Sequence, residues 1–145
     1  MTIMAELYTH DFHAWALQAA ELVRNRRFED INLEELAEEL EALGNQERKE
    51  VANRLVILLA HLLKWEFQPA HRGSSWRGTI IEQRKQIFRQ LQYSPSIKPH
   101  LQAAIEDAYP DAVDIAVDET DLPPATFPSN CHYAIEQILD KKFFP

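Results

Sequence analysis

Cysteine, glycine and long apolar runs are all scarce in this chain of 145 residues. Its one cysteine, Cys131, excludes an intramolecular disulfide and fits a reducing compartment. Only three glycines occur, which argues against a sheet-rich fold with many tight turns. The longest apolar stretch, residues 55–63, is interrupted by His61 and is too short to span a membrane.

The common catalytic and cofactor-binding motifs are also missing. The sequence has no phosphate-binding glycine loop, no Gly-x-Ser-x-Gly motif and no His-Glu-x-x-His motif. His10 and His13 could chelate a metal at a helix start, but no third ligand is obvious, so we expect no metal site and no cofactor. Residues 1–12 contain no basic region followed by an apolar run, so no signal peptide is predicted and we expect a soluble cytoplasmic protein.

The charge of the chain is negative and unevenly distributed. A formal net charge of −8 makes nucleic acid an improbable partner and disfavours anionic membranes. Nine acidic residues lie in residues 29–50, six basic residues in 72–98 and seven acidic residues in 106–121. We interpret this pattern as a basic helix that packs between acidic elements of its own chain, the alternative being a basic strip for phosphate.

Apolar residues at helical spacing predict an all-α fold. The longest predicted helix begins after Asn32, whose side chain is a suitable cap, and ends before Pro69. The predicted helices cover His10–Arg26, Leu33–Phe67, Ser75–Tyr93, Lys98–Ala108 and Asp111–Val117, with a last short helix in residues 132–139. We therefore expect a single domain, 1–145, that forms an antiparallel helical bundle built on three long helices with shorter C-terminal helices.

Large polar and aromatic side chains gather around the predicted turn in residues 60–84, AHLLKWEFQPAHRGSSWRGTIIEQR. Simple helical hairpins do not need so many of them near a bend. On helical wheels, further polar residues of the first two predicted helices border the apolar stripes. The candidate cluster comprises Asp11, Glu39, His61, Lys64, Arg72, Trp76 and Arg84. It is either a buried network of paired polar groups or a ligand-binding site.

Arg84 is the least expected member, because it falls in the middle of the apolar arc of its helix. The arc is formed by Ile80, Ile81, Phe88 and Leu91. A guanidinium in that position is costly unless a carboxylate meets it, and Glu39 and Asp11 are the predicted partners. The alternative is an arginine that lines a pocket for an anionic ligand.

The chain resembles a small all-helical bacterial family, abundant in cyanobacteria, that is catalogued as domain of unknown function 29. The resemblance covers nearly the whole chain. The residues that carry it include Tyr8-x-x-Asp11-Phe12-x-x-Trp15, residues 36–44 (LAEELEALG), His61-Leu62-Leu63-Lys64-Trp65, Gln68-Pro69, Ser75-Trp76, Gln83-Arg84, Ser94-Pro95-Ser96 and Tyr109-Pro110. It implies an all-α bundle and a bacterial cytoplasmic protein, and it supplies no reaction.

Two functional hypotheses follow from the sequence. The first is an accessory or protein-interaction module without enzymatic activity, in which the polar cluster is mostly structural and the partner is another protein or a second copy. The second is a small-ligand binder or hydrolase-type enzyme acting on an anionic group. In that case Arg72, Arg84 and Lys64 would hold the anion, and His61 with Glu39 would transfer protons. No catalytic residue is assigned.

Overall fold

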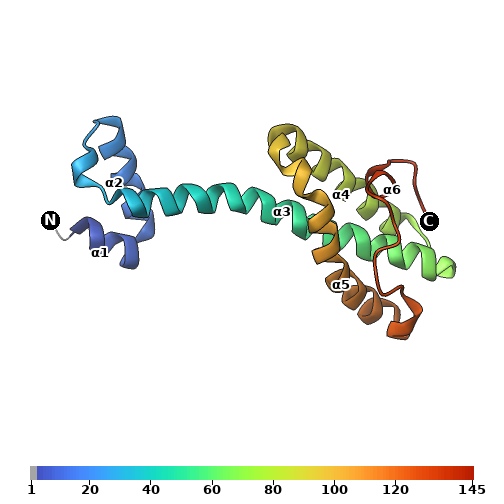
Figure 1. The fold of residues 1–145 in the computed structure, drawn as a ribbon. Helices are drawn as coiled ribbons and strands as arrows, with labels where there is room; N and C mark the ends of the chain where they lie inside the picture. Colours follow the sequence, from blue (N-terminus) through green and yellow to red (C-terminus); the bar gives the residue numbers. More distant parts are fainter. Residues whose placement is uncertain (1–2) are drawn as a thin grey trace. The chain divides into compact units, whose positions relative to one another are not determined.

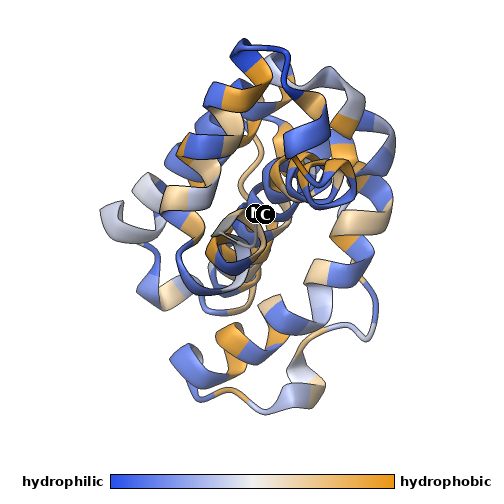
Figure 2. Cartoon of the chain, turned by 90° about the vertical axis from the view of Figure 1, so that its left-hand side faces the viewer, coloured by the Kyte–Doolittle hydropathy of each residue, from blue (hydrophilic) through white to orange (hydrophobic). Residues whose placement is uncertain are grey.

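The computed structural model describes residues 3–145, and this part of the chain contains helices, short 3-10 turns and loops but no strand. The predicted all-α class is therefore confirmed. The residues fall into two compact units, which we call unit 1 (Met1–Gln46) and unit 2 (Glu47–Pro145). Figure 2 shows apolar and polar residues interleaved along the helices of both units.

Unit 1 consists of α1 (Ile3–His10), α2 (Phe12–Arg24), a 3-10 turn (Phe28–Asp30) and the first part of α3. The helix predicted over His10–Arg26 is present as α2, but it begins later than predicted and a separate helix, α1, precedes it. The chain instead interrupts the helix at Asp11, whose Oδ1 accepts a hydrogen bond of 3.1 Å from the backbone N–H of Ala14. Aspartate is a strong N-cap because it pairs an otherwise free backbone donor, so a separate helix begins at Phe12.

The longest helix, α3, spans Leu33–Phe67, as predicted. Asn32 caps it: its Oδ1 accepts hydrogen bonds from the backbone N–H groups of Glu34 and Glu35 at 3.1 and 3.2 Å. Pro69 follows its end, where a proline cannot continue the helical hydrogen-bond pattern. The two signals that set these bounds are local, which is why the sequence predicts them.

Unit 2 contains the rest of α3 and all later elements. These are α4 (Ser74–Tyr93), α5 (Leu101–Thr120) and α6 (Ile135–Leu139), with 3-10 turns at Pro69–His71, Pro95–His100 and Pro124–Thr126. In Figure 1, α4 and α5 lie against the later part of α3, and α6 lies beside α4. Fully buried side chains from all four helices, such as Leu58, Ile80, Ile105 and Ile138, form one continuous core. The predicted bundle of long helices is therefore present, and its core lies in unit 2.

Pro110 does not end a helix, contrary to the prediction of two separate helices here. α5 continues through Pro110 to Thr120. A proline inside a helix removes one hydrogen bond and costs roughly 3 kcal/mol. Ala108, Tyr109 and Ala112 are all buried around it, so packing of this stretch against the core offsets the cost.

The buried face of α4 differs from the predicted apolar arc in some of its residues. Ile81 and Phe88 are about half exposed. The side chains that α4 buries are Ile80, Arg84, Ile87 and Leu91. Arg84 is thus enclosed as predicted.

Candidate functional site

The seven candidate residues are divided between the units. Asp11 and Glu39 belong to unit 1, and the other five belong to unit 2. Of the residues of unit 2, four lie on or near the α3–α4 connection, and Arg84 lies in the middle of α4. Each group has its own surroundings.

Lys64 is buried, with 4% of its surface exposed, and forms an ion pair with Glu119 of α5. Its Nζ atom also lies 5.1 Å from the ring centre of Trp76, which places a cation over an aromatic face. One turn earlier, Nδ1 of His61 lies 2.8 Å from the carbonyl oxygen of Ile57. Burial lowers the pKa of His61, which favours the neutral imidazole. These polar groups are paired within the chain.

Arg72 holds the α3–α4 connection and the C-terminal segment. Its Nε donates to the carbonyl oxygen of Trp65 at 2.7 Å, and its Nη2 donates to that of Pro145 at 3.1 Å. The guanidinium lies 5.4 Å from the ring centre of Trp65. Arg72 therefore ties two segments that are far apart in sequence to one another.

Arg84 binds main-chain carbonyls rather than a carboxylate, so the predicted pairing with Glu39 or Asp11 is wrong. It is 4% exposed, and its Nε and Nη2 donate to the carbonyl oxygens of Ile138 and Gln137 at 2.7 and 3.2 Å. Both acceptors lie at the C-terminal end of α6, where the last carbonyls have no partner within the helix and favour a cation. Its Nη1 is buried and has no hydrogen bond to residues 3–145.

The C-terminal residues complete this cluster, and they were not predicted from the sequence. The ring of Phe144 lies 5.0 Å from that of Trp65 and 5.4 and 5.5 Å from the guanidinium carbons of Arg77 and Arg84. In the sequence, the one signal for this packing is the pair Phe143-Phe144, which follows two lysines. Two basic residues of α4, Arg77 and Arg84, therefore pack on an aromatic ring, and among the described residues no ion pair joins α4 to α5.

Glu66 forms a second polar centre in unit 2 that was not predicted. Its Oε1 lies 2.8 Å from Nε2 of His132 and accepts a hydrogen bond of 2.7 Å from the hydroxyl of Tyr133. Burial and this hydrogen bond raise the pKa of Tyr133. These contacts fix the segment that leads into α6 onto the end of α3.

In unit 1, Asp11 and Glu39 have local structural partners. Asp11 caps α2, and Glu39 Oε1 accepts a hydrogen bond of 2.7 Å from the hydroxyl of Tyr8. That bond raises the pKa of Tyr8 to about 12. Tyr8 also packs on Trp15, with ring centres 4.8 Å apart. Glu39 is thus held at the edge of an aromatic cluster.

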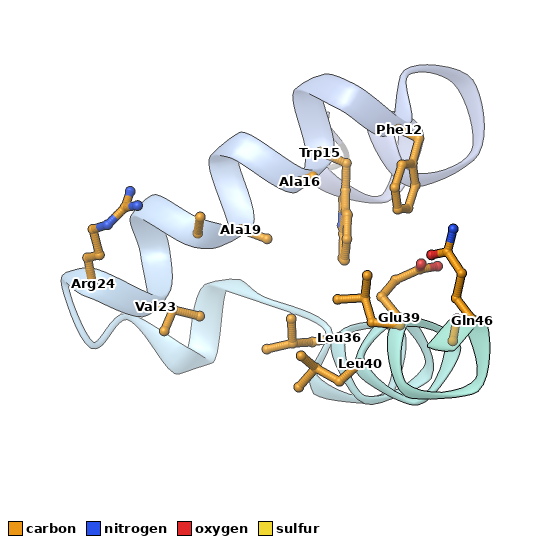
Figure 3. Close-up of a pocket in the computed structure, with 13 residues that line it drawn as sticks. Phe12, Trp15, Ala16, Ala19, Val23, Arg24, Leu36, Glu39, Leu40 and Gln46 are labelled. Atoms are coloured by element: carbon orange, nitrogen blue, oxygen red, sulfur yellow. The ribbon is translucent and has the colours of Figure 1, made fainter. Parts of the chain in front are cut away.

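Beside Glu39, an apolar groove of about 650 Å³ opens between α2 and the first part of α3 (Figure 3). Its α2 wall is formed by Phe12, Trp15, Ala16, Ala19, Ala20, Val23 and Arg24, and its α3 wall by Leu36, Glu39, Leu40, Ala42, Leu43 and Gln46. Leu40 and Leu43 are 60% and 61% exposed. Apolar stripes on these two helices were predicted from the sequence, but an open groove between them was not.

No three His, Cys, Asp or Glu side chains within residues 3–145 are grouped so that they could hold a metal ion. None of the helices described for this chain is long and apolar enough to cross a membrane.

The comparison with protein families decides the identity of the chain. The model of the family described as Domain of unknown function DUF29 matches residues 7–144, which include parts of both units. The chain belongs to this family. No curated protein and no solved structure matches this DUF29 chain. Membership confirms the resemblance seen in the sequence and assigns no activity to the groove or to the polar cluster.

Proposed function

We propose that this protein is a helical interaction module, and that the groove of unit 1 is the surface through which it binds another helical element. One observation carries this proposal: large apolar side chains line an open groove and remain exposed. Apolar patches of this kind on a folded protein commonly mark interaction sites, and grooves between two helices accept the apolar face of a further helix.

The cluster around the α3–α4 connection supports the same conclusion. Lys64, Arg72 and Arg84 would have to be available if they held an anionic ligand. Instead Lys64 pairs with Glu119, and the two arginines bind backbone carbonyls and aromatic rings of their own chain. These contacts favour a structural role for the cluster over the ligand-binding or enzymatic alternative.

We further place this module in the cytoplasm, and the state of Cys131 supports this. The thiol is free, and burial raises its pKa, which disfavours the reactive thiolate. An inert, unpaired thiol fits a reducing compartment.

Two leucines with the same exposed fraction, 61%, provide a matched test. Leu43 lines the groove, whereas Leu17 lies on α2 and does not. We expect L43E to reduce the apparent size of the tagged full-length chain in native lysate, measured by size-exclusion chromatography, and L17E to leave it unchanged. Equal profiles for the wild type, L43E and L17E would show that the groove is not a binding surface.

A further inference from the structure

We propose that the occupant of the groove is the groove of a second copy of this chain, so that two copies of unit 1 form an antiparallel four-helix bundle. This inference rests on the proposed function, because it names the partner that the groove binds. It commits to an isologous dimer, in which both copies use the same surface.

The size of unit 1 provides the first argument. Of its described residues, only Trp15, Ala19 and Ile31 are buried apolar residues. Domains of about 60 residues are already marginal in stability, and shorter ones usually need disulfides, metals or oligomerisation. The single cysteine of the chain lies in unit 2, so unit 1 has no disulfide. A second copy would supply the missing half of a core.

The spacing of the leucines on α3 provides the second argument. Leu33, Leu36, Leu40 and Leu43 follow one another at intervals of three, four and three residues. This is the spacing of the a and d positions of a coiled coil. The acids at 34, 35, 38 and 41 occupy the b, c and f positions, which point away from such a seam. Only Glu39, at a g position, borders it.

Small side chains in the lining of the groove would allow a second helix to approach closely. Ala16, Ala19, Ala20 and Ala42 are among the lining residues. Small side chains let large ones from a facing helix insert between them, which is how tightly packed cores interdigitate. The exposed Leu40 and Leu43 are the side chains that a second copy would bring.

The charges at the two ends of the groove set the direction of the pairing. Figure 3 shows Arg24 at one end, and Glu39 with Gln46 at the other. A two-fold axis perpendicular to the helices exchanges the ends, so that Arg24 of each copy faces Glu39 of the other. Without this exchange, like charges would meet. In the single chain Arg24 pairs with Glu21 at 3.1 Å, and both side chains are largely exposed, so this weak pair is easily exchanged.

Repulsion between the copies does not prevent this pairing. Unit 1 has ten acidic residues and three basic ones. Most of the acids on α3 lie outside the leucine seam. At physiological ionic strength, charges separated by more than roughly 8 Å are largely screened. In the proposed dimer Arg24 and Glu39 of the two copies face each other directly, so their attraction is screened less and sets the orientation.

A charge-exchange experiment tests the proposal on the full-length chain by sedimentation equilibrium. The wild type is expected to be a dimer. R24E alone and E39R alone should each raise the dimer dissociation constant about tenfold or more, because each places like charges at both ends of the groove. An equimolar mixture of R24E and E39R should recover wild-type affinity. In the mixed dimer the introduced acid faces the introduced base at one end, and the native pair remains at the other.

E38R is the matched control, because Glu38 is adjacent to Glu39, is exposed and does not line the groove, and its Oε2 also accepts a hydrogen bond from the Tyr8 hydroxyl, at 3.4 Å. It should leave the dimer intact. A monomeric wild type at all soluble concentrations would overturn the pairing of copies, as would a mixture that fails to recover. The proposed function would then still stand if L43E, and not L17E, reduced the size of the complex in lysate. If L43E had no effect there either, both proposals would fail.

Discussion

Unit 1 and unit 2 bury their apolar residues to very different extents. Among the described residues, twenty buried apolar side chains form the core of unit 2, against three buried in unit 1. Large exposed apolar side chains show the opposite distribution, seven in unit 1 and four in unit 2. Unit 1 also carries −7 of the chain's net charge of −8. Unit 2 thus completes its own core, whereas unit 1 presents an apolar surface within an acidic helical unit.

The largest expected difference between the units is in the cost of removing a leucine. Leu58 is fully buried in unit 2, and L58A should lower the free energy of unfolding by roughly 2–5 kcal/mol through lost burial and a residual cavity. L40A in unit 1 should cost less than about 0.5 kcal/mol in the dissociated chain, because Leu40 is mostly exposed. Urea unfolding of dilute protein measures both. Similar losses for the two variants would contradict the comparison.

Arg84 tests whether the C-terminal segment belongs to the core of unit 2. R84M keeps much of the volume but removes the hydrogen bonds to Gln137 and Ile138, so it should cost about 1.5–3 kcal/mol in urea unfolding. Adding E39L should recover none of this loss, because Glu39 binds Tyr8. If the double variant did recover the lost stability, Arg84 would instead pair with the carboxylate of Glu39, as the sequence suggested.

The cap of α2 tests how far unit 1 relies on local interactions. D11A removes the hydrogen bond to the N–H of Ala14 and should cost about 1 kcal/mol of local stability. Amide hydrogen exchange should become faster in the first turn of α2 and stay unchanged in α4 and α5. D11N, which can still accept this hydrogen bond, is the control and should exchange like the wild type.

The smallest expected effect is the pH dependence that His61 gives to unit 2. Burial lowers the pKa of His61, whereas the nearby Ile57 carbonyl and Glu119 raise it and Lys64 lowers it. As the pH falls, His61 of the unfolded chain therefore binds a proton at about pH 6.5, whereas His61 of the folded chain binds one only at a lower pH. The free energy of unfolding consequently decreases as the pH drops below about 6.5. H61Q should reduce this slope in urea unfolding at pH 7.5 and 5.5. An unchanged slope would show that His61 is not its source.

The sequence predicted those features of the fold that local signals determine. Asn32 and Pro69 bound α3, and the periodicity around Arg84 indicated its burial. Features determined by packing were missed. α5 continues through Pro110 because its neighbours are buried, and Arg84 binds carbonyls of a helix that lies more than fifty residues later. An arginine in an apolar arc indicates that an acceptor is needed, but not which one.

The candidate site was missed for a related reason. Phe12, Val23, Leu40 and Leu43 belong to the apolar stripes of the first two predicted helices, and a helical bundle is expected to bury such stripes. Periodicity shows which face of a helix is apolar, and it contains no information on what covers that face. Only the three-dimensional arrangement shows that these side chains line an open groove.

Amide hydrogen exchange as a function of protein concentration tests the central claim most directly, because it observes both units of the full-length chain in one measurement. If a second copy covers the groove, protection of residues 12–46 should increase with protein concentration, and protection of α4, α5 and α6 should not change. Exchange in residues 12–46 that is independent of concentration, from below to far above micromolar protein, would contradict the account.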